Sequence, residues 1–162
     1  VGAYARLETV EGQLEPNPEI FNLKGVLLSR LQRSNEAIEA YKACLALNPK
    51  QLEVLVNLGK SLLNVNRLDE GIEAYRKAAK LAPGNYAVSL RLAVALSSAG
   101  DKMDAIKVLD AAMKRHPDNP RLLVERAIPL SDAMSAYLRG LSVRMSQTPP
   151  LGGARDTVAS TQ

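Results

Sequence analysis

The sequence contains few of the residues on which several kinds of function depend. Its 162 residues include one cysteine, one histidine, one phenylalanine and no tryptophan. One cysteine and one histidine are too few for a disulfide framework or a structural zinc site, so we expect no metal and no cofactor. The aromatic content of 4% also leaves few platforms on which the bases of single-stranded nucleic acid could stack.

Strong charge of one sign and long apolar runs are missing as well. Lys and Arg number 21 and Asp and Glu number 17, and the formal charge of +4 is too small to predict a nucleic-acid partner. No apolar run approaches the ~18 residues of a membrane-spanning helix, so we expect a cytoplasmic protein without direct membrane insertion. The sequence opens on Val1, and the prior removal of a leader would leave the same sequence.

What the sequence does contain is a repeat of 34 residues. Pro49, Pro83 and Pro117 each follow a long segment of apolar periodicity and are spaced by that interval. Further positions keep the spacing over three copies without a gap: Gly25, Gly59 and Ala93; Leu28, Leu62 and Leu96; Ala37, Gly71 and Ala105; Ile38, Ile72 and Ile106; Tyr41, Tyr75 and Leu109; Cys44, Ala78 and Ala112. So many positions in register predict a repeat architecture.

Each unit carries two amphipathic patterns with apolar residues three and four apart, which predict paired helices. The expected helices cover residues 19–31 and 35–47, 52–65 and 69–81, and 87–99 and 103–113. Asn35, Asp69 and Asp101 stand where an N-cap or a first-turn acid would stabilise the second helix. The prolines end the second helices because proline cannot continue a helix.

Small residues indicate how the helices pack. Gly25 and Gly59 leave room for a close approach of the two helices in a unit, while Tyr41 and Tyr75 fill the space towards the next unit. One pair cannot bury its own apolar face, so stacked pairs are expected to build a continuous core. Cys44 lies at a repeat position that is small in every unit, a set of equivalent positions that we call a column. It is interpreted as a buried packing residue.

The unit resembles the tetratricopeptide repeat, whose pattern is Trp-x2-Leu-Gly-x2-Tyr, then Ala-x3-Phe, then Ala and Pro. The second copy carries Leu55, Leu58, Gly59 and Leu62, followed by Gly71, Tyr75, Ala78 and Pro83. Lys24 and Ser89 depart from the pattern, at a Leu and at the Trp position respectively. The resemblance implies an all-α fold, a right-handed superhelix (α-solenoid) of antiparallel helix pairs.

The repeat register divides the chain. We expect a second helix of a partial repeat with its turn at 1–17, full repeats at 18–51, 52–85 and 86–119, a degenerate repeat or capping helices at 120–146, and a flexible tail or linker at 147–162. Ala3, Leu7 and Val10 fit the second-helix columns, with a freestanding capping helix as the alternative. Pro129 is expected to stop the first helix of the last unit, before a new helix capped by Ser131 and Asp132.

No catalytic constellation is apparent, and we do not expect an enzyme. His116 lies in an inter-repeat turn, and the paired acids lie at helix starts, where the helix dipole stabilises them. Cations of the second helices, such as Arg76 and Lys107, are interpreted as part of a solvated convex face.

Proteins that resemble this chain bind ligands on the concave face lined by their first helices. In this chain, residues at equivalent positions of the first helices form an apolar stripe with a polar edge. This stripe is the predicted partner-binding groove, and it consists of Asn22, Val26, Val56, Asn57, Lys60, Leu90, Arg91, Val94, Val124 and Ile128. Such a stripe suits an amphipathic helix or an extended peptide, unless its members pack between neighbouring first helices. Asn57 and Arg91 match the carboxylate clamp of Hsp70/Hsp90 co-chaperones, whereas Asn22, Val26 and Ala87 do not.

We therefore predict a non-catalytic scaffold that binds a protein or peptide partner in this groove. Two alternatives remain open: the substrate-selecting region of a larger enzyme, as in proteins where such arrays precede glycosyltransferase or sulfotransferase domains, and a module that self-associates through its terminal helices. Leu90→Glu together with Val94→Glu is expected to abolish partner capture and to leave the helical content intact. Gly59→Leu is expected to destabilise the fold.

Overall fold

The computed structural model describes residues 16–129 together with residues 2, 6, 131, 132 and 135. Over these residues the chain is helical, with short turns and no strand. The helices are α2 (Pro18–Arg30), α3 (Ser34–Leu47), α4 (Leu52–Asn64), α5 (Leu68–Leu81), α6 (Tyr86–Ser98) and α7 (Lys102–Met113). A further helical stretch covers 120–129, and its C-terminal neighbours among the described residues are helical too.

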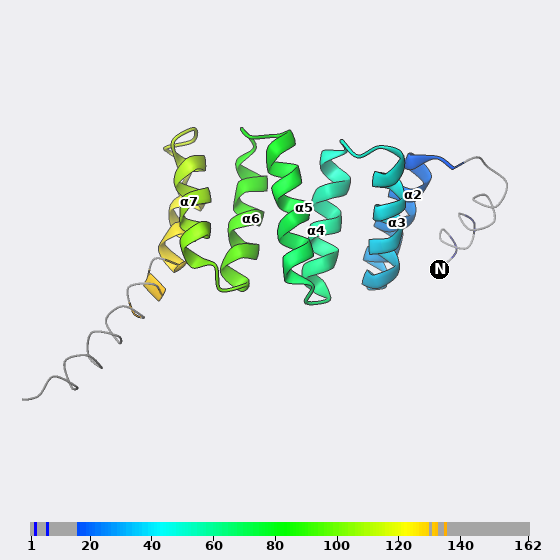
Figure 1. Ribbon diagram of the computed structural model, residues 1–162, viewed down its shortest axis with the longest axis horizontal. Helices are drawn as coiled ribbons and strands as arrows, with labels where there is room; N and C mark the ends of the chain where they lie inside the picture. Colours follow the sequence, from blue (N-terminus) through cyan, green and yellow to red (C-terminus); the bar gives the residue numbers. More distant parts are fainter. Residues whose placement is uncertain (1, 3–5, 7–15, 130, 133–134, 136–162) are drawn as a thin grey trace, which may run out of the picture.

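The helices stand side by side in a row, with the α2–α3 pair at one end and α7 near the other (Figure 1). Helix α2 packs on α3, α4 on α5 and α6 on α7, and each pair packs on the next through α3 and α4 or through α5 and α6. Helix α2 also touches α4, so these two first helices are neighbours on one side of the row. This arrangement confirms the predicted all-α solenoid of antiparallel helix pairs.

The predicted helices agree with the observed ones to within one residue at each end. The turn inside each unit contains one residue in the left-handed region, always at the same repeat position: Gln32 (φ 62°), Asn66 (φ 60°) and Gly100 (φ 93°). The amide of the next residue then donates to a carbonyl near the end of the first helix. This bond satisfies an orphan carbonyl of the helix and turns the chain into the second helix.

The helix starts differ in part from the prediction. Asp101 is the N-cap residue of α7, and Asp69 is an acid in the first turn of α5. Asn35 is neither, because α3 already begins at Ser34 and Arg33 takes the N-cap position. The side chain of Arg33 reaches forward instead, and its Nε and Nη2 donate to the two carboxylate oxygens of Glu36 at 2.6 and 2.5 Å.

The described chain after α7 is helical over residues 120–129. Ser131 and Asp132 are also helical. Leu122 is fully buried in the cluster that contains residues of α5, α6 and α7. The stretch therefore stacks on the array as a first helix would. The interpretations of 1–15 and of most of 130–162 concern residues outside the described part of the chain.

The close approach of the two helices within the first and second units depends on glycine. A Cβ atom placed on Gly25 would lie 2.5 Å from Cε1 of Tyr41, and one on Gly59 would lie 2.9 Å from Cε1 of Tyr75. These distances are shorter than real contacts, so the tyrosine rings occupy the space that the missing side chains leave. Cys44 is fully buried, as its column predicts.

Burial of Tyr41 leads to a prediction about pH. Burial raises the pKa of this side chain to about 12, and the charge of Glu53 adds to the shift. In an unfolded chain tyrosine has a pKa of about 10. As the pH rises from about 10 to 12, the unfolded chain releases a proton that the folded chain keeps, so the free energy of unfolding falls.

We expect this fall to reach about 2 kcal/mol, and the contribution to be complete below pH about 10. Urea denaturation across this range, with tyrosinate absorbance followed in parallel, measures it. Tyr41→Phe should remove that part of the pH dependence. A Tyr41→Phe variant with the pH profile of the native chain would mean that another group is responsible.

Candidate functional site

The side of the array formed by the first helices carries two adjoining hollows around α6. One has a volume of about 250 Å³ and is lined by Leu63, Tyr75, Tyr86, Ala87, Leu90, Arg91, Val94, Arg121 and Glu125. The other has a volume of about 280 Å³ and is lined by Ala93, Val94, Ser97, Ser98, Leu109, Glu125, Ile128 and Pro129. Val94 and Glu125 line both, so we treat the two hollows as one surface and call it the α6 groove.

Four of the predicted groove residues line the α6 groove: Leu90, Arg91, Val94 and Ile128. Val94 is 42% and Ile128 54% exposed, so both can meet a partner. Leu90 is 7% exposed and belongs to the core cluster beneath the groove. Leu90 therefore forms the floor, and a glutamate at this position is not expected to leave the helices intact.

The other predicted residues lie outside the α6 groove. On α2 and α4, Val26 and Val56 are half-buried against the core. On α2 the amide oxygen of Asn22 is buried, and it has no hydrogen-bond partner within the described residues. Asn57 is half-buried, Lys60 is exposed, and Val124 is an exposed residue of the 120–129 stretch.

Several residues that line the groove are not among the ten predicted groove residues. Arg121 and Glu125 come from the stretch after α7, and Tyr75 belongs to a second helix that was assigned only to the core. Tyr86 is the first residue of α6, and its ring meets the ring of His116 edge to face, with centroids 5.6 Å apart. His116 in turn lies with Nε2 2.9 Å from the carbonyl oxygen of Gly84, which ties two inter-repeat turns together.

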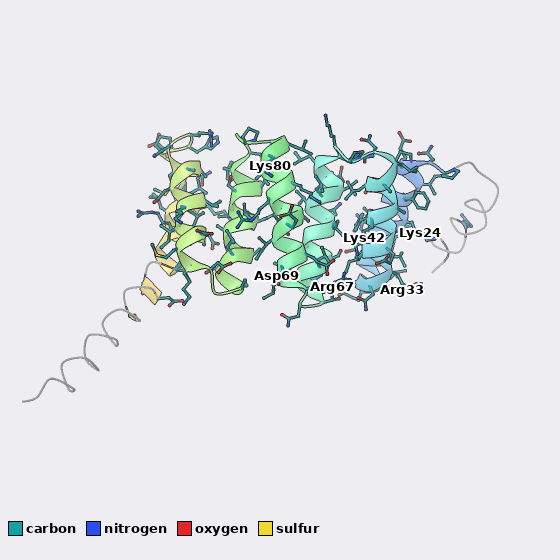
Figure 2. The ribbon with its side chains drawn as sticks, in the orientation of Figure 1. Lys24, Arg33, Lys42, Arg67, Asp69 and Lys80 are labelled. Carbon is teal, nitrogen blue, oxygen red and sulfur yellow. The ribbon has the colours of Figure 1, made fainter. Side chains whose placement is uncertain are left out.

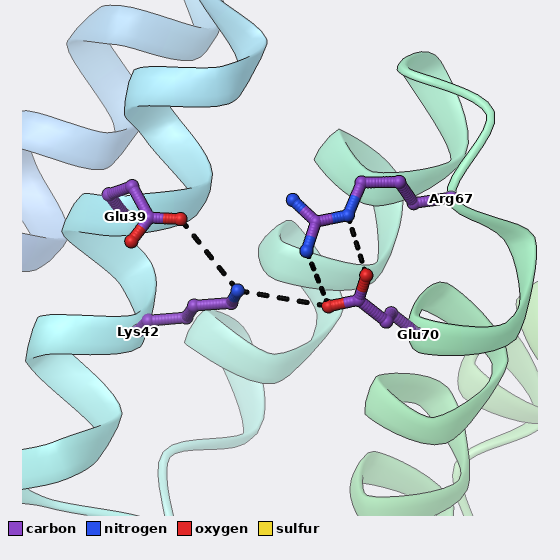
Figure 3. Close-up of polar contacts among 4 residues, drawn as sticks. All are labelled: Glu39, Lys42, Arg67 and Glu70. Atoms are coloured by element: carbon purple, nitrogen blue, oxygen red, sulfur yellow. Dashed lines mark hydrogen bonds and ion pairs between the residues drawn. The ribbon is translucent and has the colours of Figure 1, made fainter.

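The charged residues of the groove differ from those on the second helices. On the second helices, Lys42 of α3 lies 3.7 Å from Glu39 and 3.7 Å from Glu70 of α5, and Arg67 holds Glu70 by two bonds of 2.6 Å (Figure 3). One repeat later, Arg76 of α5 lies 4.0 Å from Asp104 of α7. Lys42, Arg67 and Arg76 of this face are therefore partly neutralised by neighbouring carboxylates.

Within the described part of the chain, the groove residues Arg91, Arg121 and Glu125 take part in no ion pair. Burial raises the pKa of Tyr75, and the charge and hydrogen bond of Arg91 oppose this rise. Arg91 therefore already contacts the wall of the groove through the Tyr75 hydroxyl, while its charge stays uncompensated. An apolar surface with two cations beside it can hold a chain segment that carries both an apolar side chain and an acidic group.

Two family models described as tetratricopeptide repeat match the chain, one over residues 22–86 and the other over residues 66–123. The chain is a tetratricopeptide repeat protein. No curated protein sequence matches this tetratricopeptide repeat protein significantly.

Solved structures share the fold of this tetratricopeptide repeat protein at low sequence identity. The crystal structure of MamA is 20% identical, with a TM-score of 0.75, and the match covers 82% of this chain and 77% of MamA. YrrB, a TPR protein with an unusual peptide-binding site, is 22% identical with a TM-score of 0.69, over 77% of this chain and 64% of YrrB. The first TPR of Spaghetti (RPAP3), bound to the HSP90 peptide SRMEEVD, is 16% identical with a TM-score of 0.64, over 73% of this chain and 93% of that domain.

The described residues of this tetratricopeptide repeat protein contain no helix long and apolar enough to cross a bilayer. They also contain no group of three or more His, Cys, Asp and Glu side chains arranged to hold a metal ion.

Proposed function

We propose that this protein is a non-catalytic interaction scaffold that binds a peptide or an amphipathic helix of a partner on its first-helix face, with the α6 groove as the centre of the site. The observation that carries the proposal is the combination of exposed apolar side chains, Val94 and Ile128, with the uncompensated charges of Arg91 and Arg121 in one continuous surface. Two proteins of the same fold support it: YrrB has an unusual peptide-binding site, and the Spaghetti domain binds an HSP90 peptide.

The groove residues also suggest the chemistry of the bound segment. An aliphatic or aromatic side chain of the partner would bury Val94 and Ile128, which gains about 25 cal/mol for each Å² of apolar area removed from water. An acidic group one or two residues away would meet Arg91 and Arg121. Glu125, between the two hollows, would repel an acidic group placed in the wrong register, and this repulsion adds specificity.

A peptide-library selection followed by titration of the selected peptides tests the proposal. We expect Val94→Glu to weaken binding of a selected peptide about thirtyfold, because it places a charge on the apolar part of the groove. Arg91→Ala should weaken binding of acidic peptides more than binding of their amide analogues. Lys80→Glu, an exposed position on α5, is the matched control and should leave binding unchanged.

Helical content and thermal unfolding of each variant, measured in parallel, separate a lost site from a lost fold. Peptides that bind Val94→Glu and the native chain equally well would place the partner site elsewhere on the array.

A further inference from the structure

The first helices begin in the same way but with different charges. In α2, α6 and the 120–129 stretch, an asparagine side chain accepts the backbone N–H of the residue two positions later: Asn17 from Glu19, Asn85 from Ala87 and Asn119 from Arg121, at 2.8, 3.0 and 3.1 Å. Glu53 has the same place in α4, two residues after the N-cap residue Gln51. The residues at this position are 34 apart in the chain, and we call them the start row: Glu19, Glu53, Ala87 and Arg121.

The charge of the start row reverses along the array. Glu19 and Glu53 are acids in the first turns of α2 and α4, where the helix dipole stabilises them. Arg121 stands in the first turn of its own helix, where the dipole disfavours a cation. The stability of that helix therefore does not explain Arg121, whereas a contact made in the α6 groove, which Arg121 lines, does.

The two acids of the start row are exposed and available to a partner. Within the described part of the chain, neither Glu19 nor Glu53 takes part in an ion pair. Lys50 and Lys60 are the cations nearest to Glu53 along the chain on either side, and neither pairs with it.

The tyrosines of the second helices experience the same reversal of charge. Burial raises the pKa of both Tyr41 and Tyr75, which occupy one repeat position. The charge of Glu53 adds to the rise at Tyr41, whereas Arg91 opposes the rise at Tyr75. The first-helix face therefore changes from negative to positive between one unit and the next.

The negative and positive parts belong to one continuous surface. Leu63 of α4 lines the α6 groove, and Val56 of α4 packs on the core cluster that contains Leu90. Neighbouring helices lie roughly 10 Å apart, and an extended chain advances about 3.3 Å per residue. About three residues of a bound segment therefore lead from one first helix to the next, and about six lead from the 120–129 stretch to α4.

We propose that this polarity selects a partner segment that carries both signs of charge, and that it fixes the direction of the segment. An apolar and an acidic residue occupy the α6 groove, and a basic residue about three to six positions away lies at the starts of α4 and α2, against Glu53 and Glu19. This inference rests on the proposed function, since it concerns the same segment. A uniformly acidic segment would be attracted at Arg91 and Arg121 and repelled at Glu53, so the order of the charges determines specificity.

Peptides selected against the native chain, and dependent on Val94, test the proposal. We expect them to share a basic residue about three to six positions from their acidic residue. Replacement of that basic residue by glutamate should weaken binding about tenfold, and Glu53→Lys should weaken binding of the unchanged peptide about fivefold. Glu53→Lys with the glutamate peptide should recover most of the affinity, because the two changes exchange the charges of one pair. Salt at about 0.5 M should reduce all these differences.

Asp69→Lys is the matched control and should leave binding unchanged. Asp69 is exposed, forms no ion pair within the described residues, and stands two residues after the N-cap of α5, so its substitution changes the net charge and a helix start as Glu53→Lys does. Figure 2 shows Asp69 near one end of α5 and Lys80 near the other. Because paired helices are antiparallel, the Asp69 end lies at the opposite edge of the array from the start row.

Binding that is lost in Val94→Glu but is equal for Glu53→Lys and the native chain would overturn this inference and leave the proposed function standing. Selected peptides that share no basic residue would have the same meaning. Equal weakening by Glu53→Lys and Asp69→Lys would also overturn the inference, since net charge alone would then account for the effect. Peptides that bind Val94→Glu as well as the native chain would overturn both proposals.

Discussion

A Gly59→Leu variant is expected to unfold at a much lower urea concentration than the native chain, with the free energy of unfolding reduced by about 3 kcal/mol or more. A Cβ atom at this position already lies 2.9 Å from Cε1 and Cζ of Tyr75, and a leucine adds three further carbons. Tyr75 is 3% exposed and packs in the cluster shared by α5, α6 and α7, so a displaced ring would lose packing contacts in the core.

The third unit provides a control for this prediction. At the positions of Gly59 and Tyr75 it has Ala93 and Leu109, both buried, so a methyl group is accommodated where the partner is smaller. Gly59→Ala and Tyr75→Leu should each destabilise the chain, and the double variant should be more stable than the sum of the two predicts, by about 1–2 kcal/mol. Strictly additive effects would show that the glycine is not there to make room for the ring.

The second large effect is expected at Leu90, where glutamate should reduce the free energy of unfolding by about 4 kcal/mol. The substitution removes an aliphatic side chain from the core cluster and places a carboxylate where the native side chain is only 7% exposed. Val94 lies one turn later on the same helix and is 42% exposed. Val94→Glu should therefore change the free energy of unfolding by only about 0.5 kcal/mol.

Urea denaturation of the two single variants side by side separates the floor of the α6 groove from its surface. This comparison also shows why the double variant with Leu90→Glu and Val94→Glu is unsuitable as a binding test. Any variant that contains Leu90→Glu would lose partner capture through unfolding alone. Equal destabilisation by the two substitutions would mean that Val94 is also a core residue.

The repeat register alone was sufficient to predict the helices. A spacing of 34 residues fixes where each turn must fall, and the left-handed turn positions at Gln32, Asn66 and Gly100 obey the same spacing. Gly100 and Asn66 are residue types that favour such a turn, whereas Gln32 is not, and there the register indicates the turn.

The candidate site was less predictable than the helices. The repeat position of a residue indicates on which side of its helix it lies, but not whether a neighbouring helix covers it. Val26 and Val94 share one column, yet Val26 packs partly against the core and Val94 is exposed. Leu90 and Arg91 are adjacent and differ in the same way. Arg121 and Glu125 join the groove only because the stretch after α7 stacks as a further first helix.

The ion pairs, too, could be predicted from the sequence only in part. The short pairs within one helix start, Arg33 with Glu36 and Arg67 with Glu70, have the spacing expected of neighbours on a helix surface. The contact of Lys42 with Glu70 depends on how far one second helix is displaced from the next, and no sequence pattern specifies that displacement. The sequence therefore predicts a solvated convex face, whereas Lys42 and Arg76 each reach a carboxylate of the next unit.

The linear stacking of the helices has a consequence for the entropy of folding. Among the described helices, extensive contacts join only elements that are one or two apart in the chain. No step of folding therefore has to close a loop much longer than one repeat, and the entropic cost of closure stays constant as units are added. The stability of such a chain grows by one increment for each unit and interface, so the array can gain or lose whole units while the remaining ones keep their structure.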